Sequence, residues 1–386
     1  MFKKLIIFLI YLPRSRLFFY KPKKSLVIFI GKPNFLFSLF NYSNYPKLTA
    51  NINNTIAVWR EYYNFYVILK CLFKFKFTFL EYCQEYINIV KPKLIISFLD
   101  NYDLIYKLKF KNCKKIVIQN SFRYGSNMLS FKSKNIEKDS IDHLFVYNKN
   151  IGKLFKENLK TQVHNIGSFL LNSIDISKYK KKKYKYLYIS TFRQLNSNEK
   201  KISPQTSYKQ FQDQEKKLVK TIYDYLSSKN EVLNILGGRN FSYDVEYNYF
   251  KEIIKSDVNW NFIKPKDRHY SFPYECVSSS EIILGIDSSL LYESFALGKK
   301  TIFFDCRTLD DYLIKNRHFA WPTKMENSGH FWTNELSKTS ISNTIDKVEK
   351  FNDLEWNNII QKYKTELIEY DKKNSIFDKE VSIILS

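Results

Sequence analysis

Residues 285–304, GIDSSLLYESFALGKKTIFF, carry the pattern that decides the fold class. The segment reads as the end of a buried strand, a pair of serines, a short helix closed by glycine, and a second strand. Two apolar strands joined by a helix are typical of a parallel sheet with helices on its faces. Ser288, Ser289 and Glu293 stand at the turn after the first strand, where either folding or ligand binding could require them.

Capping of the helix accounts for one of the two serines, because a serine oxygen can accept an unpaired backbone N–H there. With Ser289 as the cap, Glu293 lies one residue beyond the position of a capping box. A second serine beside free N–H groups suits an anionic phosphate, and Glu293 could accept hydrogen bonds from ribose hydroxyls. Gly298 is expected to end the helix. The segment therefore predicts a nucleotide site, with capping and surface charge as the alternative.

Apolar strands alternate with helices along most of the chain, and the pattern breaks once at the lysine run near Lys178. The strands 24–31 and 94–99 belong to the first half. The alternation begins again with YLYIST at 186–191. The sequence therefore predicts two Rossmann-like, doubly wound α/β domains that face a cleft. Residues 1–175 are expected to form the domain that binds the acceptor, and residues 176–386 the domain that binds the nucleotide donor, with terminal helices.

Ligands of such sheets bind beyond the carboxyl ends of the strands, and this rule selects candidate residues. In the second half, Arg193 follows one strand, and the glycines of LGGRN at 236–240 follow the next. Phosphate neutralisation by basic side chains here would stabilise a leaving group, although solvated surface loops are the alternative. The candidates for catalysis are Arg193 and Lys266, and those for nucleotide binding are Gly237, Gly238, Arg239, Lys264, Ser288, Ser289 and Glu293.

Polar residues also follow two strands of the first half. Asp100 is the candidate general base, because a carboxylate at a strand end could take a proton from an acceptor hydroxyl. Asn101, Asn120 and Arg123 are the candidates for holding an acceptor acid or sugar. A structural turn made by Asp100 or Asn101 is the alternative.

The chain of 386 residues has a formal net charge of +24, from lysines spread along its length. Such a charge favours anionic partners such as phosphate-bearing substrates or acidic lipids. The sequence contains no zinc-finger spacing, RNA-binding aromatic motif or base-reading basic helix, so no nucleic-acid partner is expected. The five histidines lack metal-ligand spacing in sequence, so no metal site is expected either. A G-x-S-x-G elbow is also missing.

Five cysteines without a CxxC pair indicate reduced thiols and a cytoplasmic location. The first residues, MFKKLIIFLIYLPRSRLFF, include an apolar run at 5–12 that is too short to span a bilayer, and no signal-peptide cleavage site follows it. This segment is either the first element of the core or a peripheral anchor on an acidic membrane, at the inner face of the cytoplasmic membrane.

Two such halves, with the richer phosphate signals in the second, resemble the GT-B class of glycosyltransferases. Within that class, bacterial surface-carbohydrate biosynthesis proteins of lipopolysaccharide and capsule gene sets are similar to this sequence over residues 85–375. A more distant similarity is to glycerophosphotransferases of teichoic-acid assembly and to capsule Kdo transferases. The similar segments are, in chain order, IISFLDNYDLIYKL, KIVIQNSFRYG, VHNIGSF, YLYISTFR, GIDSSLLYESFALGKKTIFF and FAWPTKMENSGHFWTN.

The resemblance implies a donor nucleotide near Ser288, Ser289 and Glu293, and an acceptor near the candidates of the first half. It also implies metal-independent catalysis with no cofactor beyond the nucleotide-sugar donor. Related proteins often have glycine at the position of Ser121 and threonine at that of Ser289. Ser289 keeps the hydroxyl, whereas Ser121 changes the backbone freedom of its loop.

We therefore expect a glycosyltransferase that moves a sugar from a nucleotide-sugar to a glycan or lipid-linked acceptor of a surface polysaccharide or lipopolysaccharide. Two alternatives stay open. One is the transfer of a polyol phosphate from a CDP-alcohol in cell-surface polymer assembly. The other is a non-catalytic basic module that binds membrane or glycan.

Overall fold

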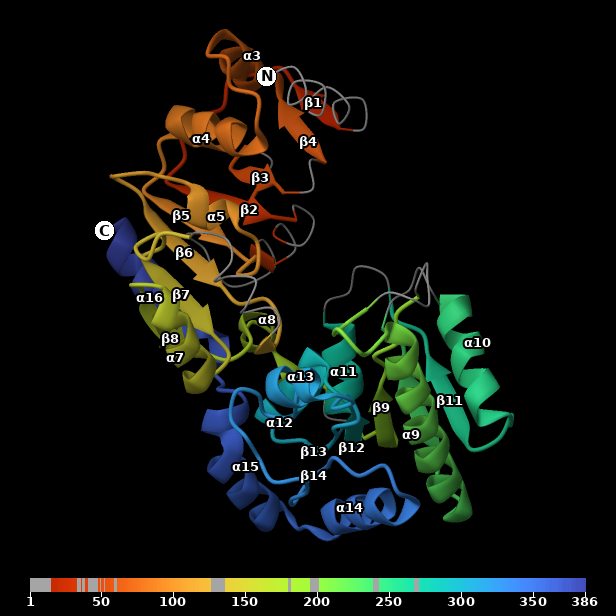
Figure 1. The fold of residues 1–386 in the computed structure, drawn as a ribbon. Helices are drawn as coiled ribbons and strands as arrows, with labels where there is room; N and C mark the ends of the chain where they lie inside the picture. Colours follow the sequence, from red (N-terminus) through yellow and green to blue (C-terminus); the bar gives the residue numbers. More distant parts are fainter. Residues whose placement is uncertain are drawn as a thin grey trace. The chain divides into compact units, whose positions relative to one another are not determined.

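The structure is a computed structural model that divides into two compact units. Unit 1 comprises residues 1–120, 127–173 and 371–386, and unit 2 comprises residues 121–126 and 174–370. The described residues are 15–32, 36, 39–40, 48, 50–51, 53–58, 61–125, 136–179, 182–194, 201–238, 243–266 and 271–386. Figure 1 shows the helices and strands of both units.

The described part of unit 2 contains a six-stranded, fully parallel sheet in the order β11-β10-β9-β12-β13-β14. In chain order this is 3-2-1-4-5-6, the strand order of the Rossmann fold. All four residues of β10 are buried, as expected for a strand covered on both faces. The strands are β9 (Tyr184–Ile189), β10 (Leu233–Leu236), β11 (Trp260–Ile263), β12 (Ser280–Gly285), β13 (Lys300–Phe304) and β14 (Trp332–Thr333).

The helices of unit 2 form two layers, since α9 contacts α10 and α14, whereas α12 contacts α11 and α15. Local signals fix their ends: Ser207 and Gln210 form a capping box at the start of α9. Gly298 ends α12 with φ +82°, as predicted. The helices are η2 (Ile176–Lys178), α9 (Tyr208–Ser228), α10 (Tyr243–Ile254), α11 (Phe272–Ser278), α12 (Ser289–Ala296), α13 (Asp311–Asn316), α14 (Lys338–Lys350) and α15 (Asp353–Leu367).

Unit 1 also contains a parallel six-stranded sheet within its described residues, in the order β3-β2-β5-β6-β7-β8. The order reverses between β2 and β5. A separate parallel pair joins β1 (Arg16–Phe18) to β4 (Tyr62–Asn64). The strands of the main sheet are β2 (Val27–Gly31), β3 (Thr55–Ala57), β5 (Leu94–Ser97), β6 (Lys114–Ile118), β7 (His143–Val146) and β8 (Gln162–Asn165).

Helices of unit 1 begin and end where the sequence signals predict. Thr78 and Glu81 form a capping box before α4, which ends at Lys91 in a left-handed conformation just before Pro92. The helices are α3 (Phe65–Phe73), α4 (Phe79–Val90), α5 (Leu104–Lys107), α7 (Lys149–Asn158), α8 (Phe169–Asn172), η4 (Lys372–Asn374) and α16 (Ser375–Leu385). The two doubly wound units confirm the predicted fold class.

The C-terminal helix α16 belongs to unit 1, although residues 176–386 were predicted to form one domain. Phe377 and Val381 are buried in the core cluster that also contains Phe145 and Phe169. In Figure 1, α16 accordingly lies beside the yellow β7 and β8. The chain thus returns to its first unit at Asp371, because the apolar face of α16 completes that core.

Candidate functional site

Strands β9 and β12 of unit 2 are neighbours, and the order of the sheet reverses between them. Ligands of open α/β sheets bind outside the carboxyl ends of the strands at such a reversal. Thr191 follows β9 there, and Asp287 and Ser288 follow β12. The turn between β12 and α12 is therefore the centre of the candidate site.

The N-terminus of α12 has no side-chain cap. Ser288 is the N-cap residue, yet its hydroxyl accepts no backbone N–H of the helix. Among the described residues, the backbone N–H groups of Ser289 and Leu290 donate no hydrogen bond, whereas that of Leu291 bonds to the Ser288 carbonyl at 3.0 Å. Free N–H groups and the positive end of the helix dipole make this end of α12 suited to an anion.

Ser289 has a different role from the predicted cap, because its Oγ accepts the backbone N–H of Phe122 at 2.9 Å. The Phe122 ring stacks on Tyr292 of α12, with ring centroids 3.9 Å apart. The hydroxyl of Tyr124 donates to the Asp287 carbonyl at 3.3 Å. The prediction that capping accounts for one serine is therefore wrong, because Ser289 anchors the loop 121–125 to unit 2.

Glu293 lies inside unit 2 and is 5% exposed. Its Oε2 accepts a hydrogen bond from the Tyr274 hydroxyl at 2.8 Å, which joins α12 to α11. This carboxylate therefore has a hydrogen-bond partner inside unit 2, and the predicted contact with ribose stays a prediction.

Two arginines, the buried Arg307 and the half-buried Arg317, surround the residue that precedes the serine turn. The Arg317 guanidinium binds Asp287 Oδ2 through Nη2 at 2.6 Å and Nε at 3.2 Å. Arg307 donates to Thr191 Oγ1 at 2.8 Å and to the Phe211 carbonyl at 2.7 Å. These contacts link β9, β12 and β13 and fix the backbone from which Ser288 projects.

The opposite charges in this cluster stabilise each other's ionised forms. Burial opposes ionisation of Asp287, but Arg317 and Arg307 outweigh it and lower the pKa of the carboxyl. The Arg307 side chain is 6% exposed, and its Nε lies 4.0 Å from Asp287 Oδ2. Within the described part of the chain this Nε has no hydrogen-bond partner. A buried donor without a partner is uncommon and is consistent with a site that accepts an acidic group.

Two buried glutamates brace the loops that follow β9 and β10. Glu215 Oε1 accepts the Thr191 hydroxyl at 2.8 Å and the Thr191 N–H at 3.3 Å. Glu246 accepts the Gly238 N–H at 3.0 Å and the Ser190 hydroxyl at 2.5 Å. The carboxyl edge of the sheet is therefore held by side chains from α9 and α10.

Asp305, the residue after β13, lies beside this cluster. Its Oδ2 accepts the Phe319 N–H at 2.8 Å, and burial raises the pKa of its carboxyl to about 6. A raised pKa beside paired charges is a feature of functional sites as well as of structural ion clusters. A small pocket opens here and is lined by Tyr124, Ile286, Asp287, Tyr292, Asp305, Arg307, Arg317, His318 and Phe319.

The predicted basic residues of unit 2 lie on the surface. Arg193 is exposed after β9, and Lys264 and Lys266 are exposed after β11. The Lys264 ammonium lies 4.4 Å from the ring centroid of Tyr243, and that of Lys266 lies 4.7 Å from Phe272. None of these cations belongs to the buried arginine cluster, so their predicted roles stay predictions.

Two glycines follow β10: Gly237 lies at a crowded position and Gly238 at an open one. A Cβ on Gly237 would lie 2.7 Å from the Phe262 ring, so packing against β11 requires glycine there. Gly238 is exposed, and its N–H is held by Glu246. Arg239, the third predicted residue of this loop, lies outside the described residues.

In unit 1, the predicted acceptor residues follow β5 and β6. Asp100 is 1% exposed, and its Oδ1 accepts the Asn120 N–H at 3.2 Å. Asn101 and Asn120 are exposed beside it. Arg123 instead belongs to unit 2, where its Nη1 donates to Ser121 Oγ at 2.6 Å. The structure thus brings Asp100, Asn101 and Asn120 together at the carboxyl edge of the sheet of unit 1.

Most residues of the ionic cluster were not predicted as site residues. Arg307 fits the strand-end rule because it follows β13. The other members of the cluster were not predicted as site residues: Asp287, Arg317, Glu215 and Asp305. Asp305 comes directly after an apolar strand and Asp287 comes two residues after one, which is a signal that the strand-end rule could have used. Nothing in the sequence indicated that Arg317, 30 residues from Asp287, pairs with it.

The fold and the serine turn define a class of protein. The two Rossmann-like units have the GT-B fold, which solved GT-B enzymes share, and the uncapped N-terminus of α12 lies at the sheet of the second unit. A variant of the wall teichoic acid polymerase TagF aligns with a TM-score of 0.52 and 14% identity, over 100% of this chain and 96% of the other. UDP-GlcNAc 2-epimerase of Methanocaldococcus jannaschii, solved with UDP-GlcNAc and UDP, aligns with a TM-score of 0.51 and 10% identity, over 92% and 99%.

The sequence comparison is more specific than the fold. A family model described as "putative O-antigen biosynthesis protein" matches residues 116–381. The chain belongs to this family, which confirms the predicted resemblance to surface-carbohydrate biosynthesis proteins. The comparison with curated proteins found no match.

Proposed function

We propose that this protein is a glycosyltransferase that moves a sugar from a nucleotide-sugar to a surface polysaccharide or lipopolysaccharide acceptor. The observation that carries the proposal is the uncapped N-terminus of α12, at the carboxyl edge where the sheet of unit 2 reverses its order. The donor diphosphate binds there, to Ser288 Oγ and to the N–H groups of Ser289 and Leu290. Membership of the O-antigen biosynthesis family supports a role in surface polymer assembly.

In the proposed reaction, the bond between the anomeric carbon and the donor phosphate oxygen breaks, and an acceptor hydroxyl forms a new bond to that carbon. The nucleoside diphosphate leaves with additional negative charge, which the helix end and nearby cations stabilise without a metal ion. The acceptor proton passes to a base, for which Asp100 is the predicted residue. Arg193 and Lys266 are predicted to contact the leaving group from the exposed loops after β9 and β11.

A thermal-shift panel of CMP, CDP, UDP, GDP and their sugar conjugates tests the donor site, because a bound ligand raises the unfolding temperature with its affinity. We expect one nucleotide series to stabilise the protein. Ser288→Ala should weaken that binding about tenfold and leave the unliganded protein as stable as before, because the Ser288 hydroxyl makes no cap.

The matched control is Ser289→Ala. It removes the hydrogen bond to Phe122 and should cost about 1 kcal/mol of stability in the unliganded protein. A flat panel would contradict the proposal of an enzyme. Unchanged nucleotide affinity in Ser288→Ala would contradict the assignment of this turn.

A second reaction, the transfer of a polyol phosphate from a CDP-alcohol, has support from the fold comparison. One of the similar TagF structures was solved after a soak with CDPG. The mass of the product on a lipid-linked acceptor distinguishes the two reactions, since it increases by a sugar in one and by a phosphorylated polyol in the other.

The apolar run at 5–12, which the sequence offers as a peripheral anchor, lies outside the described residues. We also propose that the protein acts at the inner face of the cytoplasmic membrane through an apolar surface on and beside α3. No helix in the described ranges is long and apolar enough to cross a membrane. Phe73 is 82% exposed, Phe75 is 73% exposed, and Phe19 is 71% exposed, with its ring centroid 5.2 Å from that of Phe65 of α3. Lys70 lies in the last turn of the same helix, as suits contact with acidic head groups.

A further inference from the structure

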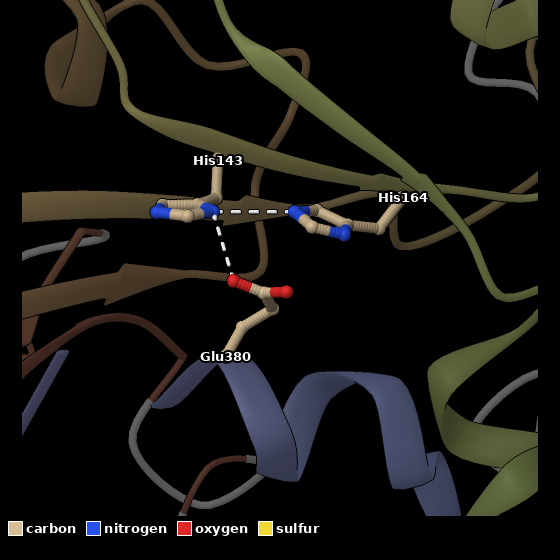
Figure 2. Close-up of side chains that lie close together, drawn as sticks. All are labelled: His143, His164 and Glu380. Atoms are coloured by element: carbon tan, nitrogen blue, oxygen red, sulfur yellow. Dashed lines mark hydrogen bonds and ion pairs between the residues drawn. The ribbon is translucent and has the colours of Figure 1, made fainter. Parts of the chain in front are cut away.

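Three metal-ligating side chains meet in unit 1, away from the candidate acceptor residues. His143 is the first residue of β7, His164 is the third residue of β8, and Glu380 lies on α16. Figure 2 shows the two imidazoles facing each other, with the carboxylate of Glu380 approaching His143 from the helix. The histidines are 21 positions apart in sequence, so only the pairing of their strands brings them together.

The distances between the ligand atoms are close to those of a tetrahedral metal site. His143 Nδ1 lies 3.2 Å from His164 Nε2 and 3.8 Å from Glu380 Oε2, and all three atoms lie within 4.8 Å of one another. Bonds of about 2.0–2.1 Å to zinc place tetrahedral ligand atoms about 3.3 Å apart. A small rotation of the Glu380 side chain, which is 21% exposed, closes the remaining gap.

The surrounding structure holds the two imidazoles in place. The parallel register pairs Phe145 with His164, and the rings of these residues stack with centroids 4.6 Å apart. Phe377, one turn before Glu380 on α16, packs against Phe145 at 5.2 Å. The strands and the helix are therefore ordered by their apolar contacts, and a metal ion would meet ligands that are already positioned.

Two imidazole nitrogens at 3.2 Å either share one proton in a hydrogen bond or bind one cation between them. A hydrogen bond satisfies the two facing nitrogens but leaves the Glu380 carboxylate 3.8 Å from His143, beyond hydrogen-bond distance. Two imidazoles and one carboxylate are a ligand set of zinc sites, with a fourth position left for water.

We propose that His143, His164 and Glu380 bind a zinc ion that fastens α16 to the edge strands β7 and β8 of unit 1. The ion ties the C-terminal helix to the sheet that it covers. It is independent of the nucleotide site proposed in unit 2.

The test uses the full chain without a polyhistidine tag, stripped with a chelator and titrated with zinc. Calorimetry should give one zinc ion per chain, and zinc should raise the unfolding temperature. Cobalt is the spectroscopic probe, because a four-coordinate Co²⁺ site absorbs strongly in the visible range. Glu380→Gln and His164→Gln should each weaken zinc binding about tenfold or more and reduce the cobalt absorption.

His330→Gln is the matched control, because it removes a histidine of unit 2 that lies outside the cluster. It should bind zinc as the unchanged chain does. Circular dichroism of the stripped variants checks that each is folded. Failure of the unchanged chain to bind zinc would overturn the proposal and leave the histidines as a hydrogen-bonded pair. Equal zinc binding by Glu380→Gln and the unchanged chain would also overturn it.

Discussion

Asp305 directly follows β13 inside unit 2, near the buried Arg307 and the half-buried Arg317. Its side chain is held by the Phe319 N–H, and its pKa is about 6 because burial disfavours the charged form. The nearby Asp287 also raises that pKa, whereas Arg317 and Arg307 keep Asp287 itself ionised. Two neighbouring carboxyl groups of one cluster thus have pKa values shifted in opposite directions.

The titration of Asp305 predicts a dependence of stability on pH. The pKa of the folded state, about 6, lies above the ordinary value of 3.8, so the folded state binds the proton more tightly than the unfolded state. The contribution to stability is therefore complete below about pH 4 and is lost as the pH rises through 6, by up to about 3 kcal/mol.

Asp305→Asn removes this titration. The free energy of unfolding in urea should fall less between about pH 4 and pH 7 for this variant than for the unchanged protein. Asp311→Asn, at an exposed position of α13, is the control and should keep the full fall. Identical pH profiles for Asp305→Asn and the unchanged chain would show that Asp305 does not titrate in this range.

At the scale of the element, α16 shows how a helix remote in sequence completes a core. Phe377 is fully buried and contacts Phe145 and Phe169, with ring centroids 5.2 Å and 4.8 Å away. Asn374, just before the helix, is buried and bonds to Asn172 at 3.0 Å. The end of the chain therefore packs in the same hydrophobic core as β7.

Phe377→Ala should therefore destabilise unit 1 by about 3–5 kcal/mol, because it leaves a cavity under α16. Hydrogen exchange measured by mass spectrometry should increase in β7 and β8. In the control Phe295→Ala, the cavity lies beside Phe331 and Trp356, and exchange should increase in unit 2 instead. Faster exchange in β9 than in β7 for Phe377→Ala would contradict the assignment of α16 to unit 1.

At the scale of the whole molecule, the net charge of +24 and the exposed aromatics on and beside α3 make one prediction about the membrane. The protein should sediment with vesicles that contain acidic phospholipid, and salt should weaken the binding. Phe73→Ser combined with Phe75→Ser should reduce the binding about tenfold, because two exposed rings no longer enter the lipid.

Val258→Ser is the control for this surface, since Val258 is 63% exposed but lies in unit 2. It should bind vesicles as the unchanged protein does. If the double variant and the control bind equally well, α3 is not the membrane contact.

The fold was predictable because its signals are local. Continuous apolar runs such as 94–96 mark strands buried on both faces, and a capping box at Thr78 marks the start of α4. The strand-end rule likewise selected Asp100, Asn120 and the serine turn from chain order alone. The assignment of α16 and of the loop 121–125 to units was not predictable, because both depend on contacts far along the chain.

The sequence by itself determined the two doubly wound halves, the turn that carries Ser288 and the resemblance to surface-carbohydrate proteins. Only the tertiary structure decided that Ser289 holds Phe122, that Arg317 pairs with Asp287, and that His143 meets His164 and Glu380. The reason is physical: helix and strand formation depends mainly on near neighbours, whereas the partner of a buried polar side chain depends on strand pairing and helix packing. Those long-range contacts turn dispersed polar residues into sites.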